Sequence, residues 1–197
     1  MHGPADSPDS RERRYGLDYV LRASPQCELT GFYEGFYSVE SGEKAGESLL
    51  AMPGRQLPDA IVSANDQMAI GVVRALARAG IRVPEDVAVV GFDDIFPGSL
   101  CDPPLTTVHQ PMRLLGDRAC ARLLERIANP ALRPATELLP TELVLRSSCG
   151  CPPGTVIRQP VPTLRVPRPE LTSAAPSLSP VPSPQPGHRP ARHAAKA

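Results

Sequence analysis

The chain has 197 residues, is 41% hydrophobic and carries no formal net charge at pH 7, which suits a protein with one moderate core. No apolar run is long enough to cross a bilayer, and the N-terminus lacks a secretory signal pattern, so we expect a cytoplasmic protein without membrane contact. The five cysteines are odd in number and scattered. We therefore expect free thiols, and no histidine pair stands near Cys149 and Cys151 to complete a metal site.

The beginning of the chain is polar and contains proline, and we expect residues 1–10 to be a disordered segment. From Ser10 to Leu21 the apolar spacing predicts a helix with basic residues in its first turn. Arg13 would lie near the start of that helix, where it could approach an anion or a hydroxyl group. The alternative is that Arg13 belongs to a solvated run of charges.

The next part of the chain predicts a strand and then a helix. Residues 27–36 mix aromatic and small side chains in a strand-like way, and Ser38 is a suitable N-cap for a helix that continues to Ala51. Tyr37 directly precedes this helix. From the sequence alone, a lone tyrosine in a loop is more often a packing or surface residue than a ligand contact.

A complete strand-helix-strand unit lies in the middle of the chain. Residues 60–64 form a short, apolar, β-branched run, which is typical of a strand in a parallel sheet covered on both faces. Helical spacing then runs from Asn65 to Gly80, a suitable C-cap. Residues 87–92 form a second buried strand, so we predict a right-handed crossover between parallel strands.

Polar side chains follow each of these two strands. Asn65 and Asp66 follow the first strand, and Asp93 and Asp94 follow the second. Open α/β sheets bind ligands at the carboxyl ends of their strands. Amides and carboxylates at that edge could hold the hydroxyl groups of a small polar molecule such as a sugar. Alternatively, the first pair only caps the helix and the second pair forms a solvated turn.

The remainder of the chain predicts mixed structure followed by a tail. Residues 96–104 are rich in proline and predict an irregular loop, residues 105–108 a short strand, residues 111–127 a helix and residues 138–145 a returning strand. Residues 150–197 are rich in proline, serine and basic side chains, and we expect a disordered Pro-rich basic tail.

Catalysis is not expected from these residues. His109 has no nucleophile and orienting acid in a recognisable pattern around it. Asp93 and Asp94 are adjacent on one loop, so they are poorly placed to flank a glycosidic bond from opposite faces. We therefore predict a binding protein and not an enzyme.

Four segments carry a resemblance to a known family. Their sequences, in chain order, are PDAIVSANDQMAIGVVRALARAGIRVPEDVAVVGFDDI, DPPLTTVHQP, RLLGDRACARLLERI and LLPTELVLRSS. Together they resemble the effector-binding domain of the lactose-repressor (LacI/GalR) family of bacterial transcription regulators. The resemblance implies a periplasmic-binding-protein-like α/β fold, of which residues 11–149 would form a partial domain. That part is mainly the C-terminal lobe, a parallel sheet flanked by helices.

The resemblance also implies a binding site and partners. The positions that match the family's effector contacts are Arg13, Tyr37, Asn65, Asp93 and Gln110, with Asp66 and Asp94 as supporting or capping neighbours. The implied partners are a small-molecule effector such as a sugar, a second copy of the chain in a homodimer, and operator DNA bound through a helix-turn-helix. No cofactor is implied.

Compared with the family, this sequence lacks the helix-turn-helix and most of the first lobe. We therefore expect one wall of the effector pocket, weak or no effector affinity, and an exposed apolar face on helix 111–127, which normally packs on the first lobe. Two other interpretations stay open. One is a sugar-binding protein of the periplasmic-binding type, and the other is a nonfunctional regulator fragment.

Overall fold

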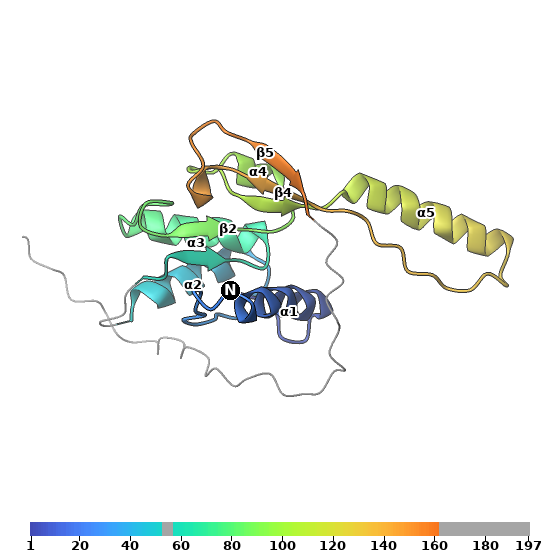
Figure 1. The fold of residues 1–197 in the computed structure, drawn as a ribbon, viewed down its shortest axis with the longest axis horizontal. Coiled ribbons are helices and arrows are strands. Elements are labelled where there is room, and N and C mark those ends of the chain that lie inside the picture. The colour runs from blue at the N-terminus through green and yellow to red at the C-terminus, as the bar shows by residue number, and fades with distance from the viewer. Residues whose placement is uncertain (53–56, 162–197) are drawn as a thin grey trace, which may run out of the picture.

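The computed structural model describes residues 1–52 and 57–161, so most of the expected Pro-rich tail lies outside the described residues. Helices and strands alternate through the central part of the chain (Figure 1). The helices of the described residues are α1 (Pro8–Arg22), α2 (Val39–Leu50), α3 (Asp66–Arg78), α4 (Phe96–Ser99), α5 (Met112–Ala128) and the 3-10 turn η1 (Ser147–Cys149).

Two small sheets lie at the centre of the fold. In the first sheet, β1 (Ala60–Val62) pairs in parallel with β2 (Ala88–Val90), as predicted. In the second sheet, β3 (Thr107–His109), β4 (Glu142–Leu145) and β5 (Ile157–Pro160) pair antiparallel in that order. Parallel bridges next to β2 and β3 join the two sheets, so the polar ends of β1, β2 and β3 share one edge.

The core lies between α3 and the parallel strands. The second apolar run supplies Val87 and Val89, which are fully buried, and the helical spacing of α3 supplies the opposing face. The prediction that the first run is also covered on both faces was wrong, because β1 has no buried residue. The buried cluster consists of Ala69, Val72, Val73, Leu76, Val87, Val89 and Leu105. This packing fixes the carboxyl end of β2 relative to the start of α3, and so positions the polar groups there.

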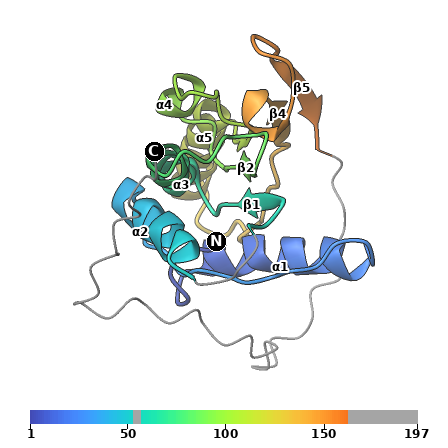
Figure 2. The same cartoon turned by 90° about the vertical axis from the view of Figure 1, so that its left-hand side faces the viewer.

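Helices α2 and α3 lie side by side (Figure 2). They approach each other closely because glycines lie at their contact. A methyl group on Gly42 would overlap the carbonyl oxygen of Met68, and one on Gly71 would overlap the carbonyl oxygen of Val39. Only glycine allows backbones to come this near. The contact holds the start of α2, and therefore the preceding Tyr37, beside the start of α3.

The expectation of disorder in residues 1–10 was wrong, because the structure places them against the sheet. The amino group of Met1 donates to the carbonyl oxygen of Val62 over 2.7 Å, and His2 bridges to Glu34. Helix α1 begins at Pro8, and Ser10 is only 2% exposed. The polar side chains that indicated a solvated segment instead cap α1 and bond to neighbouring backbone groups.

Three other local predictions were also wrong in detail. Residues 27–36 form no strand and pair only through the single bridge at Glu34. The predicted loop at residues 96–104 contains the short helix α4. The region expected to be tail from residue 150 contains β5, which pairs with β4 along four residues. Each of these features depends on partners that are distant in sequence, and local pattern does not report them.

Helix α5 extends away from the rest of the fold (Figure 1). It has no buried residue, and its exposed apolar side chains are Met112, Leu114, Leu115, Leu123, Leu124 and Ile127. This agrees with the expectation of an exposed apolar face on this helix. None of the helices within the described ranges combines the length and the apolar character needed to span a membrane.

Candidate functional site

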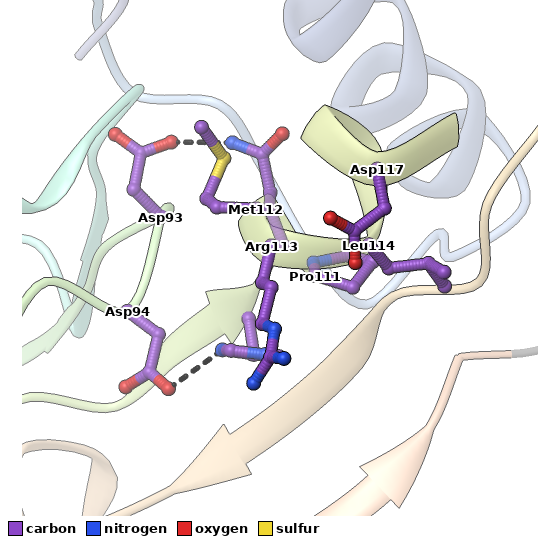
Figure 3. Close-up of a pocket in the computed structure, with 9 residues that line it drawn as sticks. Asp93, Asp94, Pro111, Met112, Arg113, Leu114 and Asp117 are labelled. Carbon is purple, nitrogen blue, oxygen red and sulfur yellow. Dashed lines mark hydrogen bonds and ion pairs between the residues drawn. The ribbon is translucent and has the colours of Figure 1, made fainter. Parts of the chain in front are cut away.

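A hollow of about 500 Å³ lies where β2 and β3 end and α5 begins (Figure 3). Its residues come from three places that the fold brings together. These are the loop after β2, the end of β3 with the residues that follow it, and the first two turns of α5. The lining residues are Asp93, Asp94, His109, Gln110, Pro111, Met112, Arg113, Leu114 and Asp117.

Asp93 connects α1 with the start of α5. Its Oδ1 accepts a hydrogen bond of 2.7 Å from Nε2 of Gln110, and the same oxygen lies 3.6 Å from Nη2 of Arg13. Burial raises the pKa of Asp93 above its ordinary value, although the charge of Arg13 and the hydrogen bond from Gln110 oppose the shift. The structure thus brings together three of the predicted ligand-binding residues.

Arg13 is held in place by the end of the sheet. Its Nη1 donates to the carbonyl oxygen of Ala64 over 2.6 Å, and the guanidinium lies 4.1 Å from the centre of the Phe92 ring. A cation over an aromatic face is attracted to the ring. These contacts show that Arg13 does not belong to a solvated run of charges. They direct its remaining donors toward Asp93.

Asp94 is buried among three nitrogen-bearing side chains, and the sequence did not indicate the two arginines among them. Its carboxylate lies 2.6 Å from Nη2 of Arg146, 3.0 Å from Nδ1 of His109 and 3.0 Å from Nη2 of Arg158. Burial alone would raise the pKa of Asp94, but the hydrogen bond and charge of Arg146 and the charge of Arg158 hold it below its ordinary value. Asp94 is therefore a charged anchor beneath the hollow, in line with a supporting role.

Asp66 supports the loop that carries Asp93. It is fully buried, and its carboxylate accepts hydrogen bonds from the backbone N–H of Ile95 at 2.9 Å and from the Thr107 hydroxyl at 2.6 Å. Burial raises its pKa to about 6, although both hydrogen bonds oppose the shift. The side chain thus connects the start of α3 to the loop after β2 and to β3.

Asn65 and Tyr37 are placed differently from the other predicted site residues. Asn65 accepts from the backbone N–H of Met68 at 3.0 Å, which makes it the N-cap of α3, and its amide donates to the carbonyl oxygen of Tyr37 at 3.2 Å. The Tyr37 hydroxyl shares a hydrogen bond of 3.0 Å with Ser7. The structure therefore favours the capping interpretation of Asn65, and it directs the Tyr37 ring toward the N-terminal segment and away from the hollow.

Backbone strain marks the same region. Tyr37, Asp93 and Asp94 have φ angles of 57°, 113° and 55°, which non-glycine residues rarely adopt. Such conformations persist where surrounding contacts enforce them, and they concentrate at ligand sites. The enforcing contacts here are the hydrogen bonds to both aspartates and to the backbone of Tyr37.

A second hollow of about 370 Å³ lies on the other side of Arg13, between α1 and the ends of β1 and β2. Most of its lining is apolar, and it includes Leu17, Phe32, Val62 and Phe92. No local pattern in the sequence indicated this hollow, because its walls come from segments far apart in the chain. Neither hollow contains a metal site, since no described group of three or more His, Cys, Asp or Glu side chains is placed to bind an ion.

The comparisons agree on one family. The profile of the periplasmic binding protein-like domain matches residues 1–149. The chain is similar to the HTH-type transcriptional repressor PurR of Mannheimia succiniciproducens, with 40% identity over 140 residues, covering 71% of this chain and 41% of that protein. The chain therefore spans about two fifths of the length of this relative.

Two solved structures are similar to this fold. One is the lac repressor dimer bound to operator and the anti-inducer ONPF, with a TM-score of 0.69 and 36% identity over 75% of this chain and 44% of that chain. The other is a complex of the transcriptional regulator CelR with cellobiose, with a TM-score of 0.69 and 34% identity over 75% of this chain and 45% of that chain. The chain belongs to the periplasmic-binding-protein-like domain family, as an effector-binding domain of the LacI/GalR type.

Proposed function

We propose that the chain senses a sugar or a similar small polyhydroxy molecule for a LacI/GalR-type DNA-binding transcriptional regulator. The observation that carries this proposal is the cluster of Arg13, Asp93 and Gln110 at the edge of the sheet, in which Asp93 and Gln110 line the first hollow and Arg13 lines the second. A carboxylate can accept two hydroxyl hydrogens, while a guanidinium and an amide donate to hydroxyl oxygens. The similar CelR structure contains cellobiose, a ligand of this chemistry.

The same cluster suggests how binding is converted into a signal. Asp93 contacts Arg13 on α1 and Gln110 just before α5, so one carboxylate joins two elements at the edge of the sheet. A ligand that competes for these contacts stabilises one position of α5 relative to the sheet. A ligand acts as a switch only if it favours one arrangement over the other. We propose that the segment from Gln110 to Met112 is the hinge.

The proposed partners follow from the family. A helix-turn-helix module would bind the DNA, since the similar PurR protein is named an HTH-type repressor. Assembly would be a homodimer, as in the similar lac repressor structure. We place this regulator in the cytoplasm, where its DNA is, and propose no catalytic role, in line with a relative that is named as a repressor.

We expect the chain of residues 1–197 by itself to bind sugars only weakly. The hollow has walls from one lobe and the first two turns of α5, and α5 has no buried residue, so a bound sugar would stay partly solvated. Ligand sites that bind tightly bury most of the ligand surface. Calorimetric titration with ribose and with cellobiose should give no binding in the micromolar range, and a micromolar dissociation constant would show that the hollow is complete.

Arg13→Ala should weaken effector binding about tenfold to a hundredfold in a regulator that carries both lobes, because a charge-assisted hydrogen bond contributes about 1.5–3 kcal/mol. The matched control is Arg11→Ala, which removes an exposed arginine of the same helix that donates a 3.4 Å hydrogen bond to the Asp6 carbonyl oxygen. The measurement is effector-induced release of operator DNA. An equal effector response in both variants would show that Arg13 does not contribute to effector binding.

A further inference from the structure

Two cysteines lie close together in the turn after β4. The Sγ atoms of Cys149 and Cys151 are 3.8 Å apart, and both residues are half-buried. Gly150 between them has a φ of 97°, a conformation that glycine adopts without strain. This turn brings the two side chains together without requiring any other part of the chain to move.

The two thiols have different surroundings. Burial opposes ionisation of Cys149, but hydrogen bonds with the Thr106 hydroxyl and with the Cys151 thiol hold the pKa of Cys149 below its ordinary value. The hydrogen bond to Cys149 raises the pKa of Cys151. A thiolate is the reactive form of cysteine. Cys149 is therefore suited to react first with another sulfur compound, and Cys151 is suited to react second, with the Cys149 sulfur.

The turn is fixed on one side of the pair. The Ser148 hydroxyl donates to the Val89 carbonyl oxygen at 2.6 Å and accepts from the backbone N–H of Thr106 at 2.8 Å. Residues 152–154, which follow the pair, are exposed. Cys149 is thus held against the sheet, while Cys151 can shift toward Cys149. The Sγ atoms are 3.8 Å apart, so they must approach by about 1.8 Å to reach an S–S bond length of about 2 Å.

We propose that Cys149 and Cys151 form a reversible disulfide by exchange with a low-molecular-weight disulfide such as oxidised glutathione. The Cys149 thiolate attacks one sulfur of that disulfide, which forms a mixed disulfide and releases one small thiolate. Cys151 loses its proton and attacks the Cys149 sulfur, which releases the second small thiol. The protein is oxidised by two electrons and the small disulfide is reduced to two thiols.

The pair borders the candidate effector site without belonging to it. Arg146, whose guanidinium binds Asp94, lies three residues before Cys149, and its carbonyl oxygen lies 3.3 Å from the Cys149 Sγ. Arg158, which also donates to the Asp94 carboxylate, lies on β5, after the pair. The disulfide would therefore stiffen the connection between two cations that hold the same carboxylate.

Mass spectrometry of the whole chain tests the proposal. The reduced protein is equilibrated with mixtures of oxidised and reduced glutathione, quenched with acid, alkylated and digested with trypsin. Cleavage after Arg146 and Arg158 gives the peptide SSCGCPPGTVIR, which contains these two cysteines and no other. We expect this peptide to lack two hydrogen atoms, to carry no alkyl group, and to return to the dithiol form as reduced glutathione increases.

The other cysteines and two variants provide the controls. Cys27 and Cys120 are exposed and far from the pair in sequence, so under the same conditions each should carry glutathione or an alkyl group. Cys151→Ser should trap glutathione on Cys149, and neither Cys151→Ser nor Cys149→Ser should give the peptide that lacks two hydrogen atoms and carries no alkyl group. A wild-type peptide that remains a dithiol while Cys27 and Cys120 are modified, or that carries two glutathiones, would overturn the proposal.

Discussion

Replacing Arg146 with methionine should lower the free energy of unfolding by about 3–5 kcal/mol, the usual cost of removing one partner of a buried ion pair. The Arg146 side chain is 7% exposed and its Nη2 lies 2.6 Å from Oδ1 of Asp94, which is 6% exposed. Its Nη1 also donates to the Leu105 carbonyl oxygen at 2.7 Å. Methionine keeps most of the length but leaves the Asp94 charge and that carbonyl group with fewer partners.

Arg158→Met is the matched control, because it removes another arginine from the same carboxylate. The Arg158 side chain is 46% exposed, so water and salt screen its interaction, and its loss should cost less than about 1 kcal/mol. Urea unfolding followed by circular dichroism measures both values. If both substitutions cost the same small amount, the buried Arg146 to Asp94 pair does not stabilise this end of the sheet.

Replacing Asp66 with alanine should cost about 2–3 kcal/mol. The backbone N–H of Ile95 and the hydroxyl of Thr107 donate to this buried carboxylate, and a buried donor without an acceptor costs about 1–3 kcal/mol. Asp66→Asn keeps the shape and one acceptor oxygen, so it should cost less. Urea unfolding at neutral pH measures the two losses, and equal stability of the alanine variant and the wild type would show that the loop after β2 does not depend on Asp66.

The stability difference between the wild type and Asp66→Asn should also depend on pH. Burial raises the Asp66 pKa from 3.8 to about 6 in the folded state, so the folded protein binds this proton more tightly than the unfolded chain does. The resulting stabilisation is complete below pH 3.8 and is lost as the pH rises through about 6. Relative to Asp66→Asn, the wild type should lose on the order of 3 kcal/mol between low and neutral pH. A constant difference across this range would contradict the raised pKa.

The central unit of the fold could be predicted because its signals are local. The β-branched run at residues 60–64, the helical spacing after Asn65 and the apolar run at residues 87–92 each indicate their own element, and the structure contains β1, α3 and β2 at these places. The polar ends of parallel strands meet at one edge by geometry alone. Asp93 was therefore predicted at the edge where the structure has it.

The contacts around these residues could not be predicted because they join distant parts of the chain. Arg146 and Arg158 lie 52 and 64 residues from Asp94, and no local pattern connects them. Tyr37 bonds to Ser7 because the first residues of the chain are ordered, which their polar composition did not indicate. Long-range pairing of this kind depends on the complete fold and not on periodicity.

The absence of buried residues in α5 has a thermodynamic consequence. Two arginines of the helix, Arg118 and Arg122, form ion pairs with Glu137 on the segment that returns toward β4. The 17 residues of α5 are near the length at which an isolated helix is only marginally stable in water. Its helix-coil equilibrium is therefore uncoupled from cooperative unfolding of the core, so this one chain contains two melting units of very unequal stability.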